Sequence, residues 1–157
     1  MKRRTQKKSR RGIRKSQKSQ TKNHYPKRYT SGLSRRDKKT QLRELNRAKR
    51  SYKRGKYIAR PKLKSFKSKK SNWTQKFHEL YPKAHTLKEI AEQTGIPIGA
   101  LKAVKKKGMG AYYSSGSRPN QTAESWGKAR MYSYILGGPT RKIDNHITRE
   151  YNVKFRR

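Results

Sequence analysis

The chain has 157 residues, of which 46 are Lys or Arg and 8 are Asp or Glu, so its formal net charge is +38. Apolar side chains make up 29% of the residues, whereas ordinary globular domains have roughly 45–50%. These values argue against a free-standing soluble enzyme, because such self-repulsion disfavours a compact free state. No stretch approaches about 18 consecutive apolar residues, so we expect no membrane span. The basic start lacks an apolar run, so we expect no signal peptide. The partner should be a polyanion.

The charge is distributed unevenly along the chain. Residues 1–70 contain 30 Lys or Arg and 2 acids, whereas residues 71–157 contain 16 and 6. Residues 1–23 have one apolar side chain after Met1, namely Ile13, so they cannot offset their ordering entropy by burial and should be flexible. We therefore divide the chain into a basic flexible arm (1–33), a basic helix (34–55), a linker (56–72), a small helical domain (73–151) and a basic C-terminal tail (152–157).

The basic helix is predicted from a capping pattern and a narrow apolar stripe. Ser34 and Asp37 have the spacing of a capping box, and Gly55 is suited to follow the last turn. The stripe consists of Leu42, Leu45, Ala48 and Tyr52. Few acids are present to pair with the cations of this helix, so we favour a helix that lies along phosphates over a merely solvated basic helix.

Residues 86–107 carry the most informative pattern of the chain. Thr86 and Glu89 form a second capping box, Gly95 suits a sharp turn with positive φ, and Pro97 suits the start of a second helix. We expect that second helix to end at Gly108. The segment resembles the helix-turn-helix unit of many DNA-binding proteins.

In such a unit the early positions of the second helix reach base edges. Here these positions are Pro97, Ile98, Gly99, Lys102 and Ala103, and none supplies the Arg, Asn or Gln that makes a bidentate base contact. The unit therefore contacts phosphates without discrimination, or it serves only as a packing unit.

The remaining elements complete an all-α prediction. A helix is expected at 73–81, a glycine- and serine-rich loop begins at Gly108, and further helices are expected at 123–136 and at about 143–151. No alternating strand pattern is longer than a few residues. The predicted core residues are Ile90, Ala91, Ile96, Leu101, Val104, Trp126 and Ile135.

No catalytic or metal-binding pattern emerges. The four histidines, His24, His78, His85 and His146, are scattered, and the chain has no cysteine. A metal site normally needs three or four ligands. We expect no enzymatic activity, no cofactor, no metal and no small-molecule substrate.

The polyanion is expected to meet clustered cations. The predicted binding residues are Lys2, Arg3, Arg4, Lys7, Lys8, Arg10, Arg11, Arg14, Lys15, Arg35, Arg36, Lys102, Lys105, Lys106, Lys107 and Arg118.

Several segments together resemble an uncharacterised family of basic proteins from large DNA viruses of algae and other protists. They are TLKEIAEQTGIP, GMGAYYSSGSRP, WGKARMYSYILGG and RKIDNHI, with RYTSGLSRRDKKTQ and RPKLKSFKSKKSNW upstream. The resemblance covers about residues 25–150. It implies a viral setting, hence location in the virion and in the host nucleus or cytoplasm during assembly, but it implies no chemistry.

Three functions fit these observations. The first is a structural virion protein that binds nucleic acid, double-stranded DNA above all, without sequence preference and so neutralises the genome. The second is a minor capsid protein, an adaptor inside the shell whose basic arm threads between capsid proteins. The third and least favoured is a ribosomal type of RNA-binding protein. The sequence does not distinguish DNA, RNA and acidic protein as the polyanion.

Overall fold

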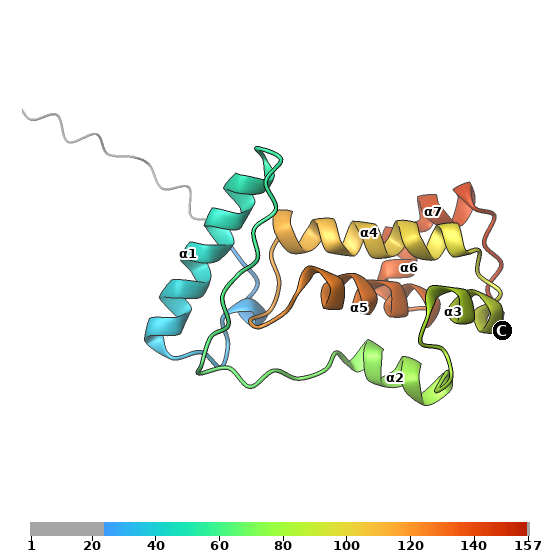
Figure 1. Ribbon diagram of the computed structural model, residues 1–157, viewed down its shortest axis with the longest axis horizontal. Helices are drawn as coiled ribbons and strands as arrows, with labels where there is room; N and C mark the ends of the chain where they lie inside the picture. The colour runs from blue at the N-terminus through green and yellow to red at the C-terminus, as the bar shows by residue number, and fades with distance from the viewer. Residues whose placement is uncertain (1–23, 157) are drawn as a thin grey trace, which may run out of the picture.

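The computed structural model describes residues 24–156, and every regular element in that range is helical (Figure 1). In chain order the elements are a short 3-10 helix η1 (Lys27–Tyr29), α1 (Arg35–Tyr52), α2 (Asn72–Leu80), α3 (Leu87–Thr94), α4 (Ile98–Ser114), α5 (Ala123–Ile135), α6 (Pro139–Ile143) and α7 (Asn145–Glu150). This architecture confirms the predicted all-α class. Of the flexible arm predicted for residues 1–33, residues 1–23 lie outside the described residues, whereas residues 24–33 contain η1 and the buried Tyr29.

Helices α4 and α5 lie side by side at the centre of the molecule (Figure 1). Helix α2 packs on α5, and α3 packs on α4 near the start of that helix. Helices α6 and α7 close the same end, and α1 lies across the opposite end, where α4 finishes. None of the helices in the described range is long and apolar enough to cross a membrane.

The helix starts follow the predicted caps. The Ser34 hydroxyl accepts a hydrogen bond from the Asp37 amide at 3.2 Å, and Thr86 and Glu89 form a complete capping box. Gly95 ends α3 with φ at 72°, in the left-handed region that glycine tolerates. Buried Ile96 then fills the turn before α4 begins. The two helices and the turn predicted at 86–107 are therefore present as a packing arrangement.

Helix α4 does not end at Gly108 as we predicted; it continues to Ser114. Gly108 faces Gly127 of α5, and a Cβ added to Gly108 would lie 2.7 Å from the Gly127 Cα. The glycine therefore permits close contact between two helices instead of ending one of them. Burial in this contact compensates for the conformational entropy that glycine loses in a helix. The predicted loop begins only after Ser114.

The apolar core lies where α2, α3, α4 and α5 meet. Of the predicted core residues, the buried ones are Ile90, Ile96, Leu101, Val104 and Ile135. The other two, Ala91 and Trp126, are only partly buried. The small residue that is fully buried in α4 is Ala100, and Phe77 stacks on Tyr132 with ring centroids 4.2 Å apart. The helical spacing of apolar residues predicted most of this core, but it did not predict the stacked pair of Phe77 and Tyr132.

The C-terminal part contains two short helices where we predicted one. Pro139 occupies the first turn of α6, and the buried Asp144 separates α6 from α7. The Asp144 carboxylate accepts two hydrogen bonds from the Arg130 guanidinium, both at 2.8 Å. A bidentate pair of this kind offsets the cost of burying the carboxylate.

The segment predicted as a linker contains no helix, but polar contacts attach it to the domain. The Arg60 guanidinium donates to the Tyr112 carbonyl at 2.8 Å and to the Ser117 hydroxyl at 2.6 Å. It also lies 3.8 Å from the centroid of the Tyr112 ring. Burial lowers the pKa of Arg60, and nearby tyrosines oppose that shift. Arg60 therefore holds the segment on the end of α4.

Asn120 makes a second attachment to the same segment. Its side-chain oxygen accepts from the Leu63 amide at 2.7 Å, and its side-chain nitrogen donates to the carbonyls of Leu63 and Phe66, each at 3.0 Å. Asn120 has φ at 57°, a conformation that asparagine tolerates better than most residues. Residues 56–71 therefore follow a fixed path over the domain.

Candidate nucleic-acid interface

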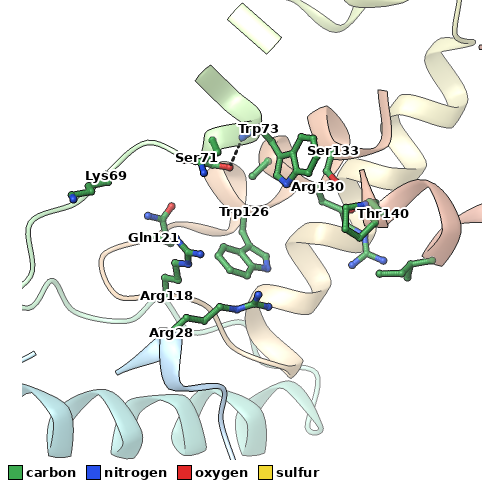
Figure 2. A pocket seen from close by; sticks show the side chains of 14 residues that line it. Arg28, Lys69, Ser71, Trp73, Arg118, Gln121, Trp126, Arg130, Ser133 and Thr140 are labelled. Atoms are coloured by element: carbon green, nitrogen blue, oxygen red, sulfur yellow. Dashed lines mark hydrogen bonds between the residues drawn. The ribbon is translucent and has the colours of Figure 1, made fainter. Parts of the chain in front are cut away.

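A hollow of about 370 Å³ opens between η1, the start of α2, the loop before α5, and helices α5 and α6 (Figure 2). We call it the tryptophan pocket and define it by two aromatic and four cationic residues. They are Trp73, Trp126, Arg28, Lys69, Arg118 and Arg130. Figure 2 shows Trp126 in the middle, with Arg28 and Arg118 on one side and Trp73 and Arg130 on the other. Segments far apart in the sequence thus supply one cationic, aromatic site.

The pocket is positively charged with little internal compensation. Among the described residues that line it, none is an Asp or a Glu. Arg28, Lys69 and Arg118 are exposed, and within residues 24–156 none of the three has a carboxylate within ion-pair distance. Arg130 differs because its guanidinium donates two hydrogen bonds to the Asp144 carboxylate. Three cations are therefore available to an anionic ligand, and the fourth is held in place by the fold.

Two local contacts fix Trp73. Its backbone amide donates to the Ser71 hydroxyl at 3.2 Å, which marks the start of α2. The far edge of its indole packs against Gly138, where an added Cβ would lie 2.7 Å from two ring atoms. The Lys76 ammonium lies 5.5 Å from the ring centroid, within range of a cation–π interaction. Trp73 is therefore a rigid wall of the pocket.

Trp126 projects from α5 on the other side. Its ring meets Tyr29 edge-to-face, with centroids 6.1 Å apart and planes at 79°. Tyr29 is buried, whereas Trp126 is only partly buried and contributes to the pocket lining. Trp73 and Trp126 are the two tryptophans of the chain. Any spectroscopic signal from tryptophan therefore reports on this pocket.

A second, more open hollow of about 540 Å³ lies over α4 and α7. Its lining includes Lys106, Lys107 and His146. The Lys107 ammonium lies 2.8 Å from the His146 ring nitrogen Nε2 and 3.8 Å from an Asp144 oxygen. Arg130 lines both hollows. The cationic face of α4 and the tryptophan pocket therefore adjoin the same buried ion pair.

The structure places the predicted binding residues in several different surroundings. Lys102 and Lys106 are exposed on α4, and Arg118 lines the tryptophan pocket. Arg35 and Arg36 are exposed at the start of α1, away from both hollows. The predicted binding residues before Asn23 lie outside the described part of the chain.

Lys105 is the predicted cation that the fold engages most directly. Its ammonium lies 2.7 Å from the Glu124 carboxylate, which Lys128 also approaches at 3.6 Å. The hydrogen bond from Lys105 lowers the pKa of Glu124. Lys105 thus connects α4 to α5 and offers less charge to a ligand than its neighbours.

The early face of α4 is partly covered. A Cβ added to Gly99 would lie 2.6 Å from the Tyr151 ring, so the ring rests directly on the backbone there. Ala103 is partly buried, and Ile98 remains exposed. These are positions that would read bases in a DNA-binding helix-turn-helix unit. The cover of Gly99 by Tyr151 favours the packing role of this unit.

Sequence reasoning missed five of the six residues that define the tryptophan pocket and identified only Arg118. The sequence analysis predicts Trp126 as a core residue and places Trp73 in the expected helix 73–81, and it assigns no binding role to Arg28, Lys69 or Arg130. One signal was present: both tryptophans of a basic chain have Lys or Arg within four residues. The positions of these residues in the sequence could not have shown that the two tryptophans and their neighbouring cations meet in one pocket.

The described residues contain no cluster of three His, Asp or Glu side chains that could hold a metal ion. A family model described as a family of unknown function (DUF5824) matches residues 26–152 of the chain. Comparison with curated proteins and with solved structures finds no match.

Proposed function

The chain belongs to this family of unknown function, and we propose that it is a non-enzymatic protein that binds nucleic acid without sequence preference. In this proposal the protein neutralises and organises a viral genome inside the virion, and the nucleic acid is double-stranded DNA. The viral setting rests on the sequence resemblance alone. The binding rests on the surface of the folded domain.

One observation carries the proposal: the folded part of the chain has far more cations than it uses internally. Residues 24–156 contain 34 Lys or Arg against 8 Asp or Glu. Five of those acids are already engaged within the fold, as ion-pair partners, in a helix cap or by a serine. Within this part of the chain, most of the cations therefore face solvent without an acidic partner. Such a surface attracts phosphates at distances up to about a Debye length. This attraction does not depend on contact with any particular base.

The absence of sequence preference follows from the side chains available on α4. Lys102 and Lys106 are exposed point charges, which bind phosphates and lack the rigid two-donor geometry of an Arg side chain. Gly99 lies under Tyr151 and presents no side chain. Contacts of this kind position a nucleic acid without specifying its sequence.

Titration of labelled duplexes at several salt concentrations tests the proposal. Each phosphate neutralised contributes about −0.9 to the slope of log K against log salt. If about ten cations engage, the slope is near −9 and affinity falls roughly 10⁵-fold between 50 and 200 mM salt. Duplexes of unrelated sequence should bind equally. A flat salt response, or strong preference for one sequence, would contradict the proposal.

Two lysines of the same helix provide a matched pair of variants. Lys102→Gln removes an exposed cation and should reduce the salt slope by about 0.9. Lys105→Gln removes a cation that Glu124 already pairs, so its effect on the slope should be smaller. Deletion of residues 1–23 removes 11 cations and no acid, and it should flatten the slope most. If the full chain binds no nucleic acid at low salt, the adaptor role within the virus shell replaces this proposal, with the same cations facing acidic protein.

A further inference from the structure

The tryptophan pocket has features that charge neutralisation of a duplex does not require. A duplex is bound through phosphates that lie on its outside, so exposed lysines suffice. Here two indoles line one hollow together with cations from three other segments. We propose that this pocket binds an unstacked base of a single-stranded nucleic acid, with Trp126 as the stacking surface. The inference rests on the proposed function, since it assigns to this one site a single-stranded form of nucleic acid, beside the duplex that the rest of the cationic surface binds.

The size and openness of the hollow fit one base with its flanking backbone. Its volume of about 370 Å³ lies near the lower end of the roughly 300–1,000 Å³ found for small-ligand sites. A base inside a duplex is stacked on both faces and cannot enter such a hollow, whereas a single-stranded base can. The pocket therefore favours single strands over duplexes.

Trp126 is the better stacking surface of the two tryptophans. Trp73 is held at its edge by Gly138 and has the Lys76 ammonium near its ring. Trp126 lies in the middle of the lining residues (Figure 2), and its aromatic neighbour Tyr29 meets it at a steep angle without stacking on it. Trp126 lines the pocket and has no stacked aromatic partner among the ring contacts of the described residues, and an indole can stack on any base, because every base has a π-face.

The cations of the pocket are placed to hold the backbone that flanks the base. Arg28 and Arg118 extend on one side of Trp126, and Lys69 lies farther away, on the segment that leads into α2 (Figure 2). All three are exposed and have no carboxylate partner among the described residues. Arg130 is committed to Asp144 and closes the far side. Arg28, Lys69 and Arg118 are therefore free to bind the ligand, whereas Arg130 supports the pocket structure.

Tryptophan fluorescence of the full-length protein tests the inference directly. Trp73→Phe leaves Trp126 as the one tryptophan of the chain, whose emission is then excited selectively over that of the tyrosines. An oligothymidylate should quench its emission at saturation, whereas an abasic oligomer with the same number of phosphates should bind by charge and quench little. Equal quenching by both probes would overturn the inference, because phosphates alone would then account for the signal. If Trp73→Phe does not fold, the wild-type protein serves, since both of its tryptophans line the pocket.

Affinity measurements on variants give an independent readout. Trp126→Leu should weaken binding of the oligothymidylate about tenfold, as expected for loss of one base–aromatic stack. It should leave duplex binding nearly unchanged. Tyr57→Leu is the matched control, because Tyr57 is an aromatic residue with 68% exposure that lies outside the pocket. Equal losses from the two variants, or an equal loss for duplex and single strand, would overturn the inference.

The two proposals fail in different ways. Absence of salt-sensitive binding to every probe would remove the proposed function and this inference together. Strong duplex binding without quenching, and without an effect of Trp126→Leu, would remove the inference and leave the proposed function in place. Circular dichroism and melting curves check that Trp126→Leu folds, and Trp126→Phe, which keeps a smaller ring, should restore part of the single-strand affinity.

Discussion

Different interactions stabilise the structure of residues 72–156 and the structure of residues 24–71. The first region buries a continuous apolar core, in which Phe77, Leu101, Val104 and Tyr134 have almost no exposed surface. Outside its one packed helix, α1, the second region buries few apolar side chains, such as Tyr29 and Leu63, and polar groups such as Arg60 and Asn120 supply further contacts with the first region. A chain with few apolar residues has thus concentrated them in one unit and used specific hydrogen bonds elsewhere.

The difference explains how a strongly cationic chain forms one structure. Burial of apolar side chains stabilises the packing of α2 to α7, while the cations of these helices remain at the surface. In residues 24–71 the cations outnumber the apolar residues, so shape comes from directional contacts. The Gln41 side chain, for example, donates to the carbonyls of Tyr29 and Ser117 at 3.3 Å each. The two regions should therefore respond differently to substitution.

The largest effect is expected at the contact between α4 and α5. Gly108→Val places a side chain where the Gly127 backbone lies 2.7 Å away, and helices cannot separate without losing core contacts. We expect the free energy of unfolding to fall by about 3 kcal/mol or more. The measurement is urea denaturation followed by circular dichroism.

Gly110→Ala is the control for this substitution. Gly110 lies in the same helix, and its added Cβ would meet only the Tyr52 hydroxyl at 3.7 Å. The free energy of unfolding should then rise by about 0.5–1 kcal/mol, because alanine loses less entropy in a helix. Similar losses from both substitutions would show that the glycine contact is not what limits the packing of these helices.

A smaller effect is expected at the attachment of residues 56–71. Arg60→Met removes two charged hydrogen bonds and leaves the Tyr112 carbonyl and Ser117 hydroxyl without that donor. We expect a loss of about 2 kcal/mol in the free energy of unfolding, with faster proteolytic cleavage within 56–71. Lys62→Met changes an exposed cation in the same segment and should alter stability by less than about 0.5 kcal/mol. Unchanged cleavage in Arg60→Met would contradict the role of Arg60 as an attachment.

The smallest effect concerns acid pH. Hydrogen bonds from Ser65 lower the pKa of Asp37, and hydrogen bonds from the amides of Thr86 and His85 lower the pKa of Glu89. A carboxyl group with a lowered pKa in the folded state stabilises it above its ordinary pKa, and that contribution is lost as pH falls through the lowered value. Stability should therefore decrease below the ordinary values of 3.8 for Asp37 and 4.5 for Glu89.

Two variants assign this acid sensitivity to the two regions. Asp37→Asn should remove the part that ties α1 to Ser65, and Glu89→Gln should remove the part that caps α3. Each variant should be less stable than the wild type near neutral pH and should lose less stability on acidification. Urea denaturation at neutral and acid pH measures both effects. An acid response that neither substitution alters would place it in other carboxylates, such as Glu124.

Local rules account for much of the architecture. Capping boxes, the turn glycine at Gly95 and the spacing of apolar residues were enough to place α2, α3 and α5 within one or two residues and α1 within three. These signals act between residues a few positions apart, so they can be read from the sequence directly. The same is true of the excess charge, from which we predicted an anionic partner.

The tertiary structure decided the rest, because the deciding contacts join distant segments. Gly108 looks like a helix end until Gly127 is placed opposite it, and Asn120 gives no sign of binding the backbone of Leu63. The tryptophan pocket depends on the same kind of long-range contact, since Arg28 and Trp126 are nearly one hundred residues apart in the sequence. Composition and local patterns determined that this chain is helical and cationic. Only the packing of its helices determined where aromatic rings and unpaired cations come together.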